Sequence, residues 1–233
     1  IDELSSNTDF FNLVLAETVR ETSFTRNGEF KRFRMKEENI KKFNPDVFKL
    51  FEQKAKRNIL GLINFNKLSN NAVANIYDFN TTLGIPASII KDGDVDMVIT
   101  SPPYGDSRTT VAYGQFSRWA NEWFGFANAG NLDSLLMGGK KASEELFSTD
   151  SLRSTLDTIR SLDEKRYYEV VSFLNDYWMS MKNVAKSVRD GGVVCYVVGN
   201  RTVKGVQINL DYYTAEMFEK CGFKHVKTIV RSI

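Results

Sequence analysis

The residues best suited to chemistry are the tetrapeptide Ser101–Tyr104, Ser-Pro-Pro-Tyr, directly after the apolar run Val95–Ile99. Two consecutive prolines each lack a backbone N–H and fix φ, so the chain must leave a parallel strand here as a stiff extended loop. The Ser101 hydroxyl and the proline carbonyls are hydrogen-bond acceptors, and Tyr104 adds a flat apolar face. Such a loop could hold a planar ring that carries an exocyclic amine. The candidate catalytic residues are Ser101, Pro102, Pro103 and Tyr104.

Residues 71–233 alternate short apolar runs with stretches of helical spacing. Glycines punctuate the pattern, with Gly191-Gly192 predicted to end one helix and Gly222 another. Strands that alternate with helices predict an α/β unit with a mainly parallel sheet, and ligands bind such folds beyond the carboxyl ends of the strands. The predicted strands are 75–77, 95–99, 193–198 and 223–230, and the predicted helices are 167–188 and 214–220.

Residues 1–70 are predicted to form a helical, basic segment. Apolar spacing predicts helices over Thr8–Val19 and Asp46–Leu60, and Asn27-Gly28 predicts a turn within the basic stretch Arg20–Met35. Residues 20–57 hold twelve Lys or Arg and six Asp or Glu, a net charge of +6, which leaves −4 for the rest of a chain whose net charge is +2. Basic residues interleaved with phenylalanines indicate a phosphate-facing surface, although a solvated helix face beside core aromatics gives the same pattern.

Ser-Pro-Pro-Tyr after an apolar strand resembles motif IV of the amino-group DNA methyltransferases, bacterial restriction-modification enzymes that use S-adenosylmethionine (SAM) to methylate N4 of cytosine or N6 of adenine. The resemblance implies a Rossmann-like sheet and a target base flipped out of double-stranded DNA into the site. It also implies that Ser101 and the Pro102 carbonyl accept hydrogen bonds from the target amine while Tyr104 stacks on the base. Serine at the first position favours cytosine N4, since asparagine or aspartate is more usual for adenine N6.

Further stretches extend this resemblance over most of the chain. Asp78 and Phe79, after the predicted strand 75–77, resemble motif III, which implies contact with the adenine of SAM, whereas Asp96 resembles an acidic residue that we expect to be structural. Residues 25–31, 105–118 and 198–201 are similar to one branch of the bacterial modification methylases. The arginines and lysine predicted to contact DNA are Arg26, Lys31, Arg108, Arg118 and Arg201.

The chain departs from the family in one respect, because it has no glycine-rich SAM-binding loop after a first strand. Gly191-Gly192 precedes a predicted strand, and Gly138-Gly139 lies in a polar stretch. That loop lets the backbone approach the methionine part of SAM, so we expect this chain alone to bind SAM poorly. Since the chain begins with Ile1, we expect the first SAM-binding βα unit to lie on a preceding N-terminal segment or on a partner chain.

Composition excludes several other functions. Two cysteines and one histidine cannot build a disulfide framework, a four-ligand zinc site or a site with two imidazoles, so we expect no metal. Neither cysteine follows a proline, which excludes the nucleophile that cytosine C5 methylation requires. No run approaches the roughly 18 apolar residues of a membrane span and no signal peptide is evident, so the cytoplasm is the expected compartment.

Two alternatives remain open from the sequence. The first is a non-catalytic DNA-binding or specificity subunit, which the missing SAM loop permits. The second is a methyltransferase of an RNA base or of a protein glutamine, where a similar loop would hold an amine or amide. The basic, Phe-rich segment at residues 20–57 favours DNA over a protein substrate.

Overall fold

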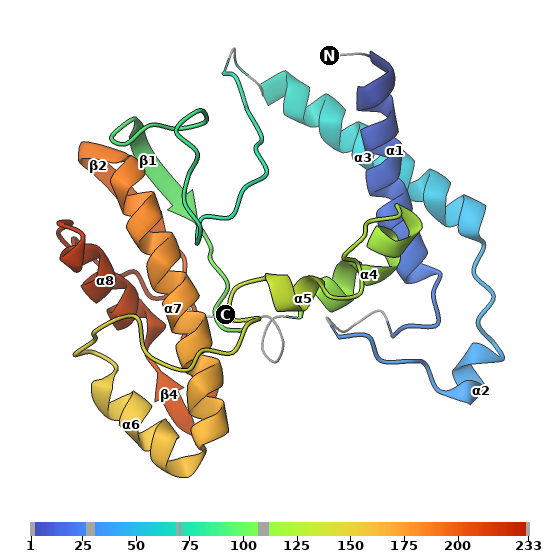
Figure 1. Ribbon diagram of the computed structural model, residues 1–233. Coiled ribbons are helices and arrows are strands. Elements are labelled where there is room, and N and C mark those ends of the chain that lie inside the picture. Colours follow the sequence, from blue (N-terminus) through green and yellow to red (C-terminus); the bar gives the residue numbers. More distant parts are fainter. Residues whose placement is uncertain (1–2, 27–30, 69, 71, 107–111, 232–233) are drawn as a thin grey trace. The chain divides into compact units, whose positions relative to one another are not determined.

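The computed structural model describes residues 3–26, 31–68, 70, 72–106 and 112–231 (Figure 1). The chain divides into two compact units. The first unit comprises residues 1–75 and 112–132, and the second comprises residues 76–111 and 133–233. Ala112–Leu132 therefore packs with the N-terminal residues, although the sequence analysis grouped it with residues 71–233.

The first unit is helical, and the predicted helices over residues 8–19 and 46–60 are confirmed. The third helix continues to Leu68, and it starts after Asp46, whose Oδ1 accepts a hydrogen bond from the Lys49 N–H at 3.0 Å and so caps the helix. It packs against the first helix through the stacked rings of Phe11 and Phe51, 6.2 Å apart. The helices of this unit are α1 (Glu3–Glu21), α2 (Glu37–Ile40), α3 (Val47–Leu68) and α4 (Tyr113–Trp123), and the short α5 (Leu132–Leu135) follows.

The basic stretch after α1 doubles back on itself. Thr25 and Arg34 form an isolated antiparallel bridge, and the Arg26 N–H donates to the Phe33 carbonyl at 2.9 Å. The predicted turn at Asn27-Gly28 lies outside the described residues. The bridge joins the described residues on either side of it.

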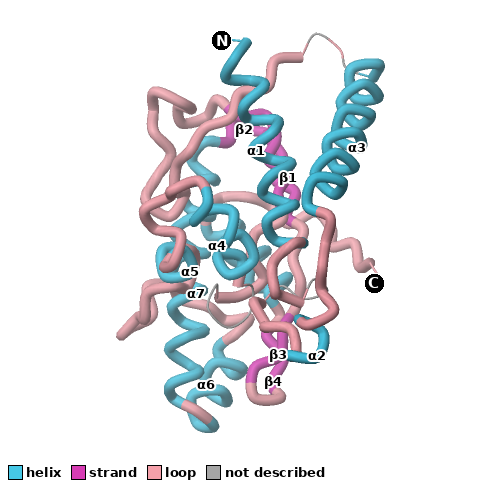
Figure 2. The backbone as a smooth tube through the Cα atoms, turned by 90° about the vertical axis from the view of Figure 1, so that its right-hand side faces the viewer, coloured by secondary structure: helices cyan, strands magenta, loops and turns pink. Residues whose placement is uncertain are grey.

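The second unit is mixed α/β, and its predicted parallel pairing is confirmed for two strands. Figure 2 shows them beside each other, with an antiparallel hairpin formed by the other two strands. Its core lies between the helices and the strands, where Phe173, Tyr177 and Tyr213 are almost completely buried. The elements are β1 (Val95–Thr100), α6 (Arg153–Leu162), α7 (Glu164–Ser187), β2 (Val188–Tyr196), β3 (Arg201–Val203), β4 (Val206–Ile208) and α8 (Leu210–Lys220).

Three expectations about the second unit are wrong. Residues 75–77 and 223–230 are not strands, and apart from Phe223, which packs against the core, their apolar side chains are exposed, with Ile76 at 97% and Val230 at 88%. Neither run pairs with a strand among the described residues, so nothing supplies the ladder hydrogen bonds that would make it one. Gly191-Gly192 does not end the long helix, because α7 stops at Ser187 and both glycines lie inside β2.

Candidate active site

The Ser-Pro-Pro-Tyr loop lies beyond the carboxyl end of β1. Parallel pairing brings Thr100 opposite Tyr196, and the Val197 N–H continues the ladder by donating to the Thr100 carbonyl at 2.9 Å. The next residue is Ser101, and the two prolines then carry the chain away from the sheet. The loop therefore leaves from the edge at which α/β folds bind their ligands.

Within the loop, Ser101 and Tyr104 are joined by a hydrogen bond. The Ser101 Oγ and the Tyr104 hydroxyl are 2.8 Å apart, and both residues are exposed, Tyr104 by 36%. The Tyr104 ring lies against Gly199, because a Cβ added there would be 3.0 Å from ring atom Cδ2. The loop thus offers an accessible hydroxyl and an aromatic ring that are fixed relative to each other.

Beyond Tyr104 the loop is anchored by a buried ion pair. Asp106 Oδ2 is 3.3 Å from Arg201 Nη1, and their side chains are 3% and 10% exposed. The Arg201 guanidinium also lies over the Phe173 ring, 5.8 Å from its centroid. Burial lowers the pKa of Arg201, and the Asp106 carboxylate opposes that shift. The structure therefore gives Arg201, which the sequence suggested as a DNA contact, the position of a structural ion pair.

The residues suggested for the adenine of SAM lie before a turn that is attached to α7. Asp78 is exposed and Phe79 is half-buried. In the turn that follows, the Thr81 carbonyl accepts a hydrogen bond from Asn183 Nδ2 at 2.8 Å, and the Thr81 hydroxyl is 2.7 Å from that of Ser180. An exposed carboxylate held beside an anchored turn can accept hydrogen bonds from an amine or a ribose hydroxyl.

Asp96, expected to be structural, forms an ion pair across the sheet with Arg189 of β2. The register of β1 and β2 shifts between Val95 and Met97, so Asp96 lies at an irregularity of the ladder. Both side chains are more than half exposed, so the pair contributes little to stability. Its position fits a role in strand pairing.

The basic turn, which is our name for the basic stretch Arg20–Met35 of the first unit, packs arginines on aromatic rings. The Arg26 guanidinium lies 4.7 Å from the Phe33 ring centroid, and that of Arg32 lies 4.7 Å from the Trp119 ring of α4. Trp119 also donates from Nε1 to Thr25 Oγ1 at 3.1 Å. Stacking on an aromatic ring holds a guanidinium in a fixed position. Arg32 was missed as a candidate, although the alternation of basic and aromatic residues could have indicated it.

The other predicted DNA contacts differ in their surroundings. Arg118 of α4 forms an ion pair with Glu122 one turn along the helix, and its side chain is 34% exposed. Lys31 is half-buried at the edge of the basic turn. Arg108 lies outside the described residues. Arg26, Lys31 and Arg118 all belong to the first unit, and for Arg118 the sequence alone did not indicate this.

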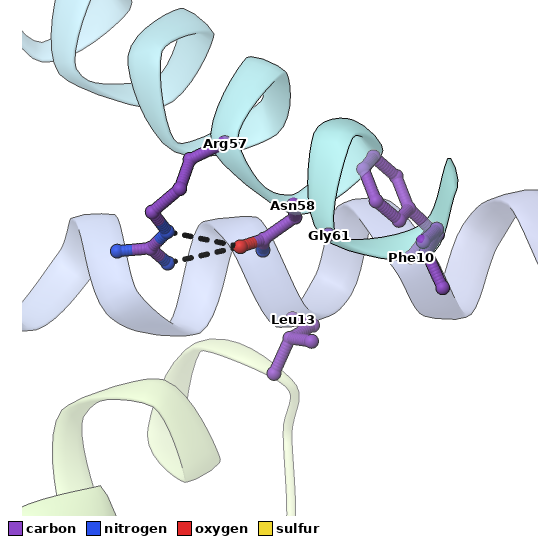
Figure 3. A pocket seen from close by; sticks show the side chains of 6 residues that line it. Phe10, Leu13, Arg57, Asn58 and Gly61 are labelled. Carbon is purple, nitrogen blue, oxygen red and sulfur yellow. Dashed lines mark hydrogen bonds between the residues drawn. The ribbon is translucent and has the colours of Figure 1, made fainter. Parts of the chain in front are cut away.

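A separate apolar pocket of about 420 Å³ lies between α1 and α3 (Figure 3). Its polar residues are Arg57 and Asn58, and the guanidinium donates to Asn58 Oδ1 at 3.0 and 3.2 Å. Arg57 also binds Glu17 of α1 at 2.7 Å. With its polar groups paired in this way, the pocket is suited to packing rather than to catalysis. Its lining is Phe10, Leu13, Arg57, Asn58, Gly61 and Leu62.

The cysteines and the histidine all lie in the described part of the chain. No group of three or more His, Cys, Asp or Glu residues within it is placed to hold a metal ion. Cys195 and Cys221 are free thiols, and His225 Nε2 is 3.1 Å from Thr228 Oγ1. Across these same residues, no helix has the length and apolar character needed to cross a membrane.

Sequence comparison adds an independent observation to this geometry. The chain is similar to a Type II methyltransferase. It is 35% identical over 240 residues to M.MvaI of Kocuria varians, and the match covers 96% of this chain and 53% of that methyltransferase. The chain thus spans about half the length of the curated relative it matches. No family model and no solved structure matches it.

Proposed function

We propose that this chain is the catalytic part of a DNA methyltransferase of the restriction-modification type. The single observation that carries the proposal is the Ser-Pro-Pro-Tyr loop, which leaves the carboxyl end of a parallel strand with Ser101 and Tyr104 joined by a hydrogen bond. The similarity to a Type II methyltransferase over 96% of the chain supports the same function. The proposed substrate is the exocyclic amine of a base flipped out of double-stranded DNA.

The residues of the loop have separate roles in holding that base. The ring stacks on Tyr104, and the amine donates hydrogen bonds to the Ser101 hydroxyl and the Pro102 carbonyl. These bonds draw the nitrogen toward sp³ geometry and aim its lone pair at an incoming methyl group. The amine forms the new N–C bond as the carbon–sulfur bond of the donor breaks, and the amine then loses one proton to water. Serine at position 101 favours N4 of cytosine as the target.

The proposed methyl donor is SAM, which supplies an electrophilic methyl group on a sulfonium sulfur. This chain's residues suit only its adenosine end, where the exposed Asp78 carboxylate can accept from an amine or a hydroxyl and Phe79 offers an aromatic face. The segment after β1 is Ser-Pro-Pro, and the segment after β2 has the single Gly199, so neither provides a glycine-rich turn for the methionine end. We therefore propose that this end is bound by a further polypeptide segment.

The experiment that tests the function measures methyl transfer from tritiated SAM to genomic DNA. The chain is assayed alone and as a chimera in which it replaces the matched residues of the Kocuria varians relative. We expect transfer by the chimera, and digestion of the product to nucleosides to yield N4-methylcytosine. Recovery of N6-methyladenine instead would show that the target is N6 of adenine. A folded chimera that binds DNA and transfers no methyl group would contradict the enzymatic function and favour a non-catalytic DNA-binding subunit.

The basic turn is proposed to contact DNA phosphates. Replacing Arg26 and Lys31 together by glutamine is expected to weaken duplex binding to a similar extent for every sequence, because phosphate contacts carry no base information. The slope of log Kd against log salt should fall by about 2, roughly one for each lost contact. Fluorescence anisotropy at several salt concentrations measures both quantities. The matched control removes two exposed lysines of the second unit, Lys165 and Lys186, and equal slopes for the two variants would show that the turn is not the contact surface.

A further inference from the structure

Residues 197–201, which are the connection from β2 to β3 and the first residue of β3, touch the Ser-Pro-Pro-Tyr loop or its flanks at three successive places. The Val197 N–H binds the Thr100 carbonyl just before the loop, and Gly199 lies against the Tyr104 ring. Arg201 binds Asp106 just after it. The two segments therefore run beside each other as a pair, with Tyr104 and Gly199 at the middle contact.

A side chain at Gly199 would lie closer to the Tyr104 ring than an ordinary van der Waals contact. A Cβ added to Gly199 would be 3.0, 3.3 and 3.4 Å from ring atoms Cδ2, Cγ and Cε2 of Tyr104. Gly199 has no positive φ, so its backbone conformation is one that alanine also adopts. Glycine is thus favoured at this position by the Tyr104 ring and not by the backbone conformation.

Contacts on either side of Gly199 prevent the two segments from moving apart to accommodate a side chain at position 199. Asp106 and Arg201 are both buried, and a Cβ at Gly138 would be 2.9 Å from the Asp106 Cβ on another side. The Asn200 side chain accepts a hydrogen bond from the Asp211 N–H at the start of α8, at 3.3 Å. A methyl group at position 199 must therefore be accommodated by displacement of the Tyr104 ring, which is 36% exposed.

We propose that Gly199 is a positioning residue that sets the plane of the Tyr104 ring for stacking on the target base. This inference rests on the proposed function, since it assigns a role to the same loop. The Tyr104 ring lies against Gly199, and its hydroxyl is hydrogen-bonded to Ser101. A shift of the ring therefore also disturbs the Ser101 hydroxyl, the proposed acceptor for the amine. Displacements well below 1 Å are enough to reduce the rate of a reaction that depends on orientation.

A double-mutant cycle on methyl transfer tests the positioning role, with the chimera described above as the enzyme. Gly199→Ala is expected to lower kcat about tenfold with little change in KM for SAM. In a Tyr104→Ala background the same substitution should have no further effect, because the ring through which it acts is gone. The control Gly61→Ala, in α3 with nothing within 4 Å of the added Cβ, should leave kcat unchanged. Full additivity of Gly199→Ala and Tyr104→Ala would overturn the proposal.

A second measurement needs no catalysis and uses the chain itself. With 3-fluorotyrosine incorporated, the ¹⁹F resonance of Tyr104 is assigned from its loss in Tyr104→Phe. Gly199→Ala should shift this resonance and leave those of the buried Tyr177 and Tyr213 in place, whereas Gly61→Ala should shift none of them. An unchanged Tyr104 resonance would refute the contact. The two proposals can fail separately. If Gly199→Ala shifts the Tyr104 resonance but the chimera with Gly199 intact transfers no methyl group, the contact is supported and the proposed function of the loop is contradicted.

Discussion

Tyr104→Ala is expected to lower the rate of methyl transfer by about 10- to 100-fold. Stacking of a base on an aromatic side chain contributes about 1–3 kcal/mol, and its loss also releases the orientation that the amine needs. Tyr104 is exposed by 36% and lies beside Gly199, so its removal opens no cavity in the core. The loss should therefore appear in kcat rather than in the free energy of unfolding.

Two companion variants separate the roles of the ring and of the hydroxyl groups. Tyr104→Phe keeps the ring and removes the hydrogen bond to Ser101, so it should retain most of the activity, while Ser101→Ala removes the proposed acceptor of the target amine. Single-turnover assays on the chimera measure the rates of Tyr104→Ala, Tyr104→Phe and Ser101→Ala, and thermal melting verifies that each variant is folded. Tyr212→Ala, an exposed tyrosine on α8, is the matched control. Activity of Tyr104→Ala within a few-fold of this control would show that the catalytic loop is wrongly assigned.

Local signals predicted the part of the fold that places the loop. The Pro-Pro pair marked the point where β1 ends, and helical spacing marked α7 within three residues of its observed start. Both signals depend on residues close together in the chain: a proline cannot extend a ladder, and an apolar stripe must face a core. The parallel pairing of β1 with β2 followed from the alternation of predicted strands with predicted helices.

The errors arose where a distant partner decides the outcome. Residues 75–77 and 223–230 have the apolar character of strands, but strand formation requires a neighbour to pair with. The ion pair of Arg201, predicted as a DNA contact, could not be foreseen either, because nothing local reveals that Asp106, 95 residues earlier, pairs with it. The grouping of α4 with the basic turn likewise depends on contacts such as Trp119 to Thr25, 94 residues apart.

Glu216 of α8 should make the second unit sensitive to acid. Its carboxylate accepts hydrogen bonds from the Thr149 hydroxyl at 2.7 Å, from the Asp150 N–H at 2.9 Å and from the Ser151 hydroxyl at 2.6 Å. Lys220 is 3.0 Å away. Burial alone raises the pKa of Glu216, but the hydrogen bonds from Ser151, Asp150 and Thr149, with that from Lys220, outweigh it and lower the pKa to about 2. The carboxylate thus ties α8 to the turn that precedes α6.

The pKa of Glu216 is lower in the folded state than the ordinary 4.5, so the stabilisation is fully present above pH 4.5 and is lost as the pH falls toward 2. Because solvent partly screens these interactions, the shift contributes about 2 kcal/mol. Glu216→Gln should therefore be destabilised relative to the wild type by about that amount at pH 7, and the difference should shrink steadily below pH 4.5. Urea unfolding at pH 7, 5, 4 and 3 measures it, with Glu219→Gln on the same helix as the control. A difference that stays constant across this range would mean that the Glu216 side chain acts through packing, because only the ionised carboxylate accepts all of these hydrogen bonds at once.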